Sequence, residues 1–188
     1  MKFISFLFFS LFLTSCHPDT PWDETCCRGK IQDGTYYDPD GYFSVQLPSF
    51  PPPALIQEET PGPETSIVSF RSPKGDLMKV ELQRGLFAKK IVDEDGKKAE
   101  KVFNSLVLPQ LTDKTPSLKK VKGEIVLEEE KKPAYFAIVE LAGPPKIQRG
   151  IFVFLDKEGY VVLSYQDSEA NLLKENLLEI RNSYVTSF

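Results

Sequence analysis

Residues 134–165 read AYFAIVELAGPPKIQRGIFVFLDKEGYVVLSY, and this segment carries the clearest structural pattern of the chain. It holds three apolar runs rich in β-branched and aromatic residues, at 134–141, 148–155 and 160–165, as is typical of β-strands. Their connectors are short, whereas a parallel crossover needs about a dozen residues. Together with another such run at 121–127, the segment predicts an antiparallel meander.

Segments upstream and downstream of the meander predict the remaining elements. Further strands are expected at 42–47, 54–58, 65–71 and 77–83, with a Pro-Lys-Gly turn that favours a hairpin between the last two. A helical period appears at 94–108, with Asp93 or Asp95 as N-cap and an end before Pro109, and again at 168–183. This order predicts one α+β domain, an antiparallel β-sheet with helices packed on its faces.

The first sixteen residues have the composition of a secretory signal. Lys2 precedes an apolar run, residues 3–13, that is shorter than the roughly 20 residues of a membrane-spanning helix. The sequence Leu13-Thr14-Ser15-Cys16 resembles the lipobox of bacterial lipoproteins. The resemblance implies cleavage before Cys16, diacylglycerol on its thiol, and a palmitate-type acyl chain on the new amino terminus. An ordinary signal peptide with a chance cysteine is the alternative.

The lipobox resemblance also predicts the organisation and location of the chain. Residues 1–15 are the expected signal peptide, the polar and turn-rich residues 16–39 a flexible tether, and residues 40–188 a single domain. Two acyl chains anchor a protein stably to a membrane without a spanning helix. We expect a protein of the bacterial cell envelope, and the absence of Asp after Cys16 favours the outer membrane by the same resemblance.

Two adjacent cysteines and one histidine lie in the expected tether. Cys26 and Cys27 are poorly placed to bond to each other, so they are candidates for an intermolecular disulfide in an oxidising compartment. Unpaired or capped thiols are the alternative, and metal capture with His17 lacks ligands and fixed geometry. Because His17 is the chain's one histidine, a Ser-His-Asp or Cys-His centre inside the domain is excluded.

Charge and motif content exclude several functions. The chain holds 23 Lys and Arg against 27 Asp and Glu, a net charge of −4, and an acidic chain without a basic stripe disfavours a nucleic-acid partner. Lysine clusters are interrupted by acidic runs such as 93–95 and 128–130, which is typical of a solvated surface. No glycine-rich phosphate loop, zinc motif or calcium loop occurs, so no cofactor and no metal are expected.

Two short elements resemble the PsbP family and related bacterial lipoproteins. They are the opening DPDGYFSVQLP at 38–48 and the closing strand, helix and SYVTSF at 159–188. The resemblance implies an α/β/α sandwich over about residues 40–188 and, for most members, a non-enzymatic binding or assembly role. It supplies no catalytic residues for this chain.

The function expected from these observations is a membrane-anchored, non-enzymatic lipoprotein that binds or assembles with another envelope protein. Tyr36 and Tyr37, beside the domain, are the candidate interface residues, because amphipathic rings are enriched at protein interfaces. One alternative is a periplasmic carrier of a small ligand or lipid, which predicts a closed apolar cavity. Another is a carboxylate-based hydrolase that uses strand acids such as Glu81 and Glu140.

Overall fold

The structure is a computed structural model, which describes residues 29–47, 55–62, 64–71, 77–85, 92–128, 132–141, 147–156, 159–167 and 173–186. The predicted signal peptide, the lipidation site Cys16, and the thiols Cys26 and Cys27 lie outside these residues. No helix within them has the length and apolar character needed to cross a membrane.

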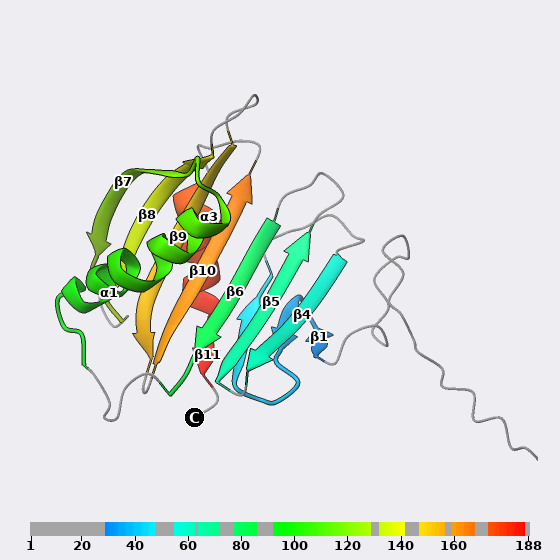
Figure 1. The fold of residues 1–188 in the computed structure, drawn as a ribbon. Coiled ribbons are helices and arrows are strands. Elements are labelled where there is room, and N and C mark those ends of the chain that lie inside the picture. Colours follow the sequence, from blue (N-terminus) through cyan, green and yellow to red (C-terminus); the bar gives the residue numbers. More distant parts are fainter. Residues whose placement is uncertain are drawn as a thin grey trace, which may run out of the picture.

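The centre of the domain is a seven-stranded antiparallel sheet (Figure 1). Its strands in spatial order are β4 (Leu55–Gly62), β5 (Thr65–Arg71), β6 (Leu77–Gln83), β10 (Gly159–Asp167), β9 (Ile147–Asp156), β8 (Ala134–Leu141) and β7 (Lys119–Val126). The meander β7–β10 and the β5–β6 hairpin follow the sequence prediction. The two halves join where β6 pairs with β10, from Gln83 opposite Tyr160 to Leu77 opposite Gln166.

A second antiparallel sheet contains residues that the sequence placed in the tether. Its order is β1 (Lys30–Gln32), β2 (Thr35–Tyr37), β3 (Phe43–Gln46) and β11 (Val185–Thr186). Tyr36 on β2 is 1% exposed and its ring lies 5.3 Å from that of Phe70 on β5. The folded domain therefore includes residues 29–39, which corrects the expected boundary, because strands of three residues are too short to show a period.

The first helical segment continues beyond the predicted end. It comprises α1 (Lys97–Val102), the π-helical η1 (Phe103–Val107) and α2 (Leu108–Lys114). The Leu108 N–H donates to the Phe103 carbonyl, and Pro109 falls in the first turn of α2, where its missing N–H is not required. The prediction that the helix ends before Pro109 is therefore wrong.

Two acidic side chains cap the start of this helical segment. One Asp93 carboxylate oxygen accepts from the Ala99 N–H at 2.9 Å, and the other accepts from the Lys98 N–H at 3.2 Å. Asp95 Oδ1 accepts from the Lys97 N–H at 3.2 Å. The N-cap residue is Gly96, so neither aspartate occupies the predicted N-cap position, although both accept from N–H groups of the first turn.

The elements form three layers (Figure 1). The helical layer α1–η1–α2 covers one face of the large sheet over β7–β10, around Phe103, Tyr135 and Val153. The opposite face packs on the small sheet and on α3 (Leu173–Ser183), around Phe70, Phe136 and Leu163. The domain is therefore α+β, with an antiparallel sheet between layers that contain helices, as expected.

An ion pair ties α3 to the connection between β7 and β8. The Arg181 side chain is 3% exposed, and its Nη1 lies 2.9 Å from Glu128 Oε2. Its Nη2 donates to the Lys132 carbonyl. Because Arg181 is a buried charge with partners on the meander, α3 has a defined position against β8 and β9.

Candidate functional site

The helical layer covers only part of the sheet face on its side. Over β4–β6 that face carries half-buried side chains, which include Thr65, Ile67, Ser69, Lys79, Glu81 and Gln83, whereas the alternate residues on β5 and β6 are buried against the small sheet. Figure 1 shows α1 and α2 in front of β7–β10 and no described element in front of β4–β6. We call this surface the open face.

A hollow lies at the step where the helical layer ends and the open face begins. Its volume is about 60 Å³. The helical layer and three strands form its walls. The helical layer contributes Val107, Gln110, Leu111 and Lys114, β6 contributes Lys79 and Glu81, β10 contributes Tyr160, Val162 and Ser164, and β9 contributes Arg149 and Ile151. We call it the step hollow.

The charges in the step hollow are predominantly positive. Lys79, Lys114 and Arg149 contribute three cationic groups, and Glu81 is the one carboxylate. Glu81 is already engaged, because Lys79 Nζ lies 2.8 Å from its Oε2 and Gln83 Nε2 donates to its Oε1 at 3.1 Å. Among the described residues, neither Lys114 nor Arg149 has a carboxylate partner.

Arg149 is a half-buried guanidinium on β9. Its Nη2 donates to Gln166 Oε1 on β10 at 2.8 Å, which uses one of the five donors that a guanidinium carries. Burial lowers its pKa from the ordinary value, because removal from water disfavours the charged form. A carboxylate of a bound molecule could accept from two of the four remaining donors.

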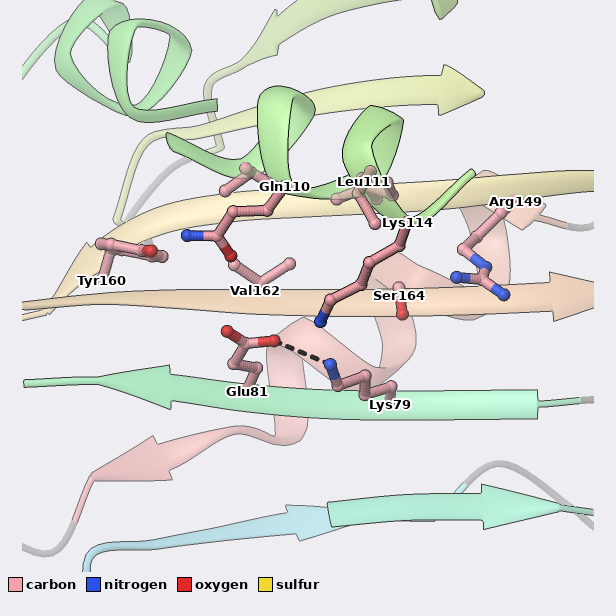
Figure 2. A pocket seen from close by; sticks show the side chains of 11 residues that line it. Lys79, Glu81, Gln110, Leu111, Lys114, Arg149, Tyr160, Val162 and Ser164 are labelled. Atoms are coloured by element: carbon pink, nitrogen blue, oxygen red, sulfur yellow. Dashed lines mark hydrogen bonds and ion pairs between the residues drawn. The ribbon is translucent and has the colours of Figure 1, made fainter. Parts of the chain in front are cut away.

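Tyr160 closes the other end of the step hollow, opposite Arg149 (Figure 2). Its side chain is 3% exposed, and burial, followed by the nearby Glu81 charge, raises its pKa to about 12. The hydroxyl is therefore protonated at neutral pH and acts as a hydrogen-bond donor rather than as a base.

The carboxylates named as hydrolase candidates do not meet. Glu81 points to the helix side of the sheet, between Val80 and Leu82, which face the other side. Glu140 follows Val139, which belongs to the core under the helical layer, so Glu140 lies on the opposite face. A glycoside-hydrolase pair needs carboxyl groups about 5–9.5 Å apart on one side. The described residues also contain no group of acidic, histidine or cysteine side chains that could hold a metal ion.

The two tyrosines predicted as interface residues have different surroundings. Tyr36 belongs to the core, and its hydroxyl donates to Glu58 Oε1 at 2.7 Å. Tyr36 is therefore a structural residue, which corrects that expectation. Tyr37 is 46% exposed and stays a candidate for an interface.

Apart from Glu81, which the sequence offered as a hydrolase candidate, the residues of the step hollow were not selected from the sequence. A sequence feature that could have indicated them is a charged residue at a strand position where the alternating pattern predicts an apolar residue facing the helices. Arg149 alternates with Ile151 and Val153 on β9, both of which face the helical layer. The contribution of Lys114 required knowledge that the helix continues past Pro109.

Comparisons with known proteins assign a fold and no family. No protein-family model matches the chain, and no curated protein matches its sequence. The solution structure of cyanobacterial PsbP (CyanoP) from Synechocystis sp. PCC 6803 superposes with a TM-score of 0.59 at 14% identity, over 81% of this chain and 91% of that one. The chain therefore has a PsbP-like fold.

A second structure overlaps with only part of a longer protein. It is a crystal structure from Bacteroides thetaiotaomicron VPI-5482, with a TM-score of 0.37 and 14% identity. The match covers 83% of this chain, which spans about half (49%) of that protein.

Proposed function

We propose that this protein is a lipid-anchored lipoprotein of a bacterial cell envelope, whose domain binds another envelope protein and performs no catalysis. Leu13-Thr14-Ser15-Cys16 supports the anchor by its resemblance to a lipobox. The absence of Asp at position 17 favours delivery to the outer membrane. The anchor brings the domain to a membrane, and the domain supplies the binding surface.

The observation that carries the binding role is the open face with the step hollow at its border. Half of one sheet face has no covering layer among the described residues (Figure 1). Its side chains are mostly polar, so the face is stable in water, and the cationic hollow beside it offers a specific contact. A non-obligate protein interface is about as polar as the rest of a protein surface, and arginine is enriched in it.

Two observations favour binding over the alternatives. Glu81 and Glu140 lie on opposite faces of the sheet, so the two strand carboxylates named for a hydrolase do not form a pair. Its volume of about 60 Å³ is well below the roughly 300–1,000 Å³ of pockets for drug-sized ligands. The step hollow is therefore too small to enclose a lipid, and it suits a single side chain of a protein better.

The anchor is tested by labelled palmitate and membrane fractionation of the full chain. We expect label in the wild-type protein and its recovery with outer-membrane vesicles on a density gradient. Cys16→Ala should lose both label and membrane retention, whereas Cys26→Ala should keep both. An unlabelled, soluble wild-type protein would refute the anchor.

The binding role is tested by site-specific photo-crosslinking in cells that express the full chain. A photoreactive residue at Ser69 on the open face should give an adduct with an envelope protein. The same residue at Glu175, exposed on α3 in the opposite layer, is the matched control and should not give that adduct. Equal adducts at both positions, or none at Ser69, would argue against the open face as the binding surface.

A further inference from the structure

We propose that the step hollow binds a carboxylate side chain in an acidic segment of the partner protein, with Arg149 and Lys114 as its anchoring cations. This inference rests on the proposed function and names the chemistry by which the domain recognises its partner. The step hollow and the open face together form the surface that the acidic segment occupies.

The first argument is local charge. The chain as a whole has a net charge of −4, yet the step hollow gathers three cationic side chains around one carboxylate. Lys79 is neutralised by Glu81 at 2.8 Å. Lys114 and Arg149 remain without an acidic partner among the described residues, so the step hollow attracts a negatively charged group.

The second argument is unused hydrogen-bond capacity. Arg149 makes one hydrogen bond, to Gln166, within the part of the chain that is described. In Figure 2, Lys114 extends from α2 toward Glu81 and Lys79, and Gln110, Tyr160 and Ser164 also line the step hollow. The Lys114 side chain is exposed and Arg149 is half-buried, so water can reach their free donors. A carboxylate that accepts from Arg149 and Lys114 would replace this water with charge-assisted bonds.

The third argument is the geometry of the cation. A guanidinium binds a carboxylate or a phosphate through two parallel hydrogen bonds. Glu and Asp carboxylates are the anionic side chains that an unmodified protein partner carries, and the competition experiment below separates the two anions. The volume of about 60 Å³ is several times the 10–15 Å³ that one water needs, which suits a carboxylate group.

The fourth argument selects a protein segment over a free carboxylic acid. The step hollow opens directly onto the open face, since Lys79 and Glu81 belong to both. The neighbouring Thr65, Ser69 and Gln83 side chains are half-buried and can hydrogen-bond an extended backbone. An acidic side chain in the step hollow would place the chain that carries it across β6 and β5.

The inference is tested with peptides on the purified full chain in detergent micelles. The probes are pools of fluorescent decapeptides that carry a central Glu or Asp, and the same pools with Gln or Asn at that position. We expect the acidic pools to bind at least about tenfold more tightly than the amide pools. Equal binding of the two pools, or no binding of the acidic pools, would overturn the inference.

Charge-removing variants locate the binding site. Arg149→Gln should weaken binding of the acidic pools at least about tenfold, and Lys114→Gln several-fold, because charged hydrogen bonds are lost. Lys101→Gln removes the same charge from an exposed position on α1 away from the step hollow and should leave binding unchanged. Lys114 is exposed, so its variant decides the question even if Arg149→Gln does not fold. Unchanged binding in Lys114→Gln and Arg149→Gln would refute the assignment.

Competition with small anions distinguishes a site for a peptide carboxylate from a site for a free anion. Sodium acetate at millimolar concentration should compete weakly with the acidic peptides, and inorganic phosphate should compete no better than its ionic strength predicts. Tight phosphate binding in the absence of peptide binding would identify a small-anion site instead and overturn the inference.

The crosslinking experiment separates this inference from the proposed function. A Ser69 adduct that persists in Arg149→Gln and Lys114→Gln would refute the carboxylate anchor and leave the binding role intact. If acidic peptides bind but no adduct with an envelope protein forms, the carboxylate site stands and the proposed envelope partner is refuted.

Discussion

The two halves of the helix-side sheet face differ in what covers them and in what they contain. Over β7–β10 the strands present apolar side chains, among them Tyr135 and Val153, to Phe103 on the helical layer. Over β4–β6 the same face presents mostly polar side chains and has no described cover. On this face the meander half therefore contributes apolar packing to the domain, while the hairpin half has no cover within the described residues, and the step hollow lies at their border.

The largest expected effect comes from the covered half. Phe103 is 0% exposed and its ring lies 5.2 Å from that of Tyr135. Phe103→Ala should lower the free energy of unfolding by about 3–5 kcal/mol, because it leaves a cavity in the core.

A similar truncation on the open face should lower the free energy of unfolding far less. Ile67 is half-buried and belongs to neither core, so Ile67→Ala should cost about 1 kcal/mol. Urea unfolding followed by circular dichroism measures both variants. Equal losses in the two would contradict the difference between the halves.

The next largest loss of stability is expected where the two halves join, at the pairing of β6 with β10. A Cβ on Gly159, at the start of β10, would collide with the backbone carbonyl of Gln83 on β6. Gly159→Ala should therefore lower the free energy of unfolding by about 1–3 kcal/mol through forced displacement of the strands. Gly62→Ala, where a Cβ meets nothing within 4 Å, is the control for thermal unfolding. A neutral Gly159→Ala would mean that β6 and β10 are not held this closely.

The free energy of unfolding should depend on pH through Tyr160, which is buried at the border between the two halves. Its pKa of about 12, against the ordinary value of 10.0, means that an unfolded chain releases this proton first. The tyrosine therefore contributes stability that is complete below pH 10 and is lost between about pH 10 and 12, by roughly 2 kcal/mol.

The variant Tyr160→Phe isolates that contribution. The difference in unfolding free energy between wild type and variant, measured by urea titration at several pH values, should fall across this window. The difference in phenolate absorbance between the two proteins should titrate near pH 12. A midpoint near pH 10 would show that Tyr160 is solvated.

The smallest expected effect is on the open face itself. Lys79 and Glu81 form an ion pair whose lysine side chain is 31% exposed, and exposed pairs contribute about 0–1 kcal/mol. Lys79→Gln should therefore change the free energy of unfolding by less than about 1 kcal/mol. A much larger loss, detected by urea unfolding, would indicate that the open face is part of the stable core.

Much of the fold was predictable because its signals are local. The strands at 65–71 and 77–83 have alternating burial, which follows directly from the period of two. The boundaries that failed depended on distant partners. β2 is strand because Tyr36 packs against Phe43 and Phe70, and the helix passes Pro109 because η1 rearranges the preceding hydrogen bonds.

The candidate site was less predictable than the fold. Lys79, Lys114 and Arg149 are unremarkable in the sequence, since lysine and arginine occur throughout the chain. They become a cluster because β6 pairs with β10 and α2 ends above that junction. Such proximity between residues 79 and 149 is a product of strand order, which single-sequence periodicity does not report.

Local patterns in the chain were enough to predict the α+β class, the antiparallel meander and the positions of most strands, and they carry the expectation of a lipid anchor at Cys16. These follow from local periodicity, short connectors and a short motif. The assembled fold was needed to show which half of the sheet is covered, that Tyr36 is a core residue, and that Arg149 and Lys114 line one hollow, because layer packing and strand order depend on contacts between residues far apart in the chain.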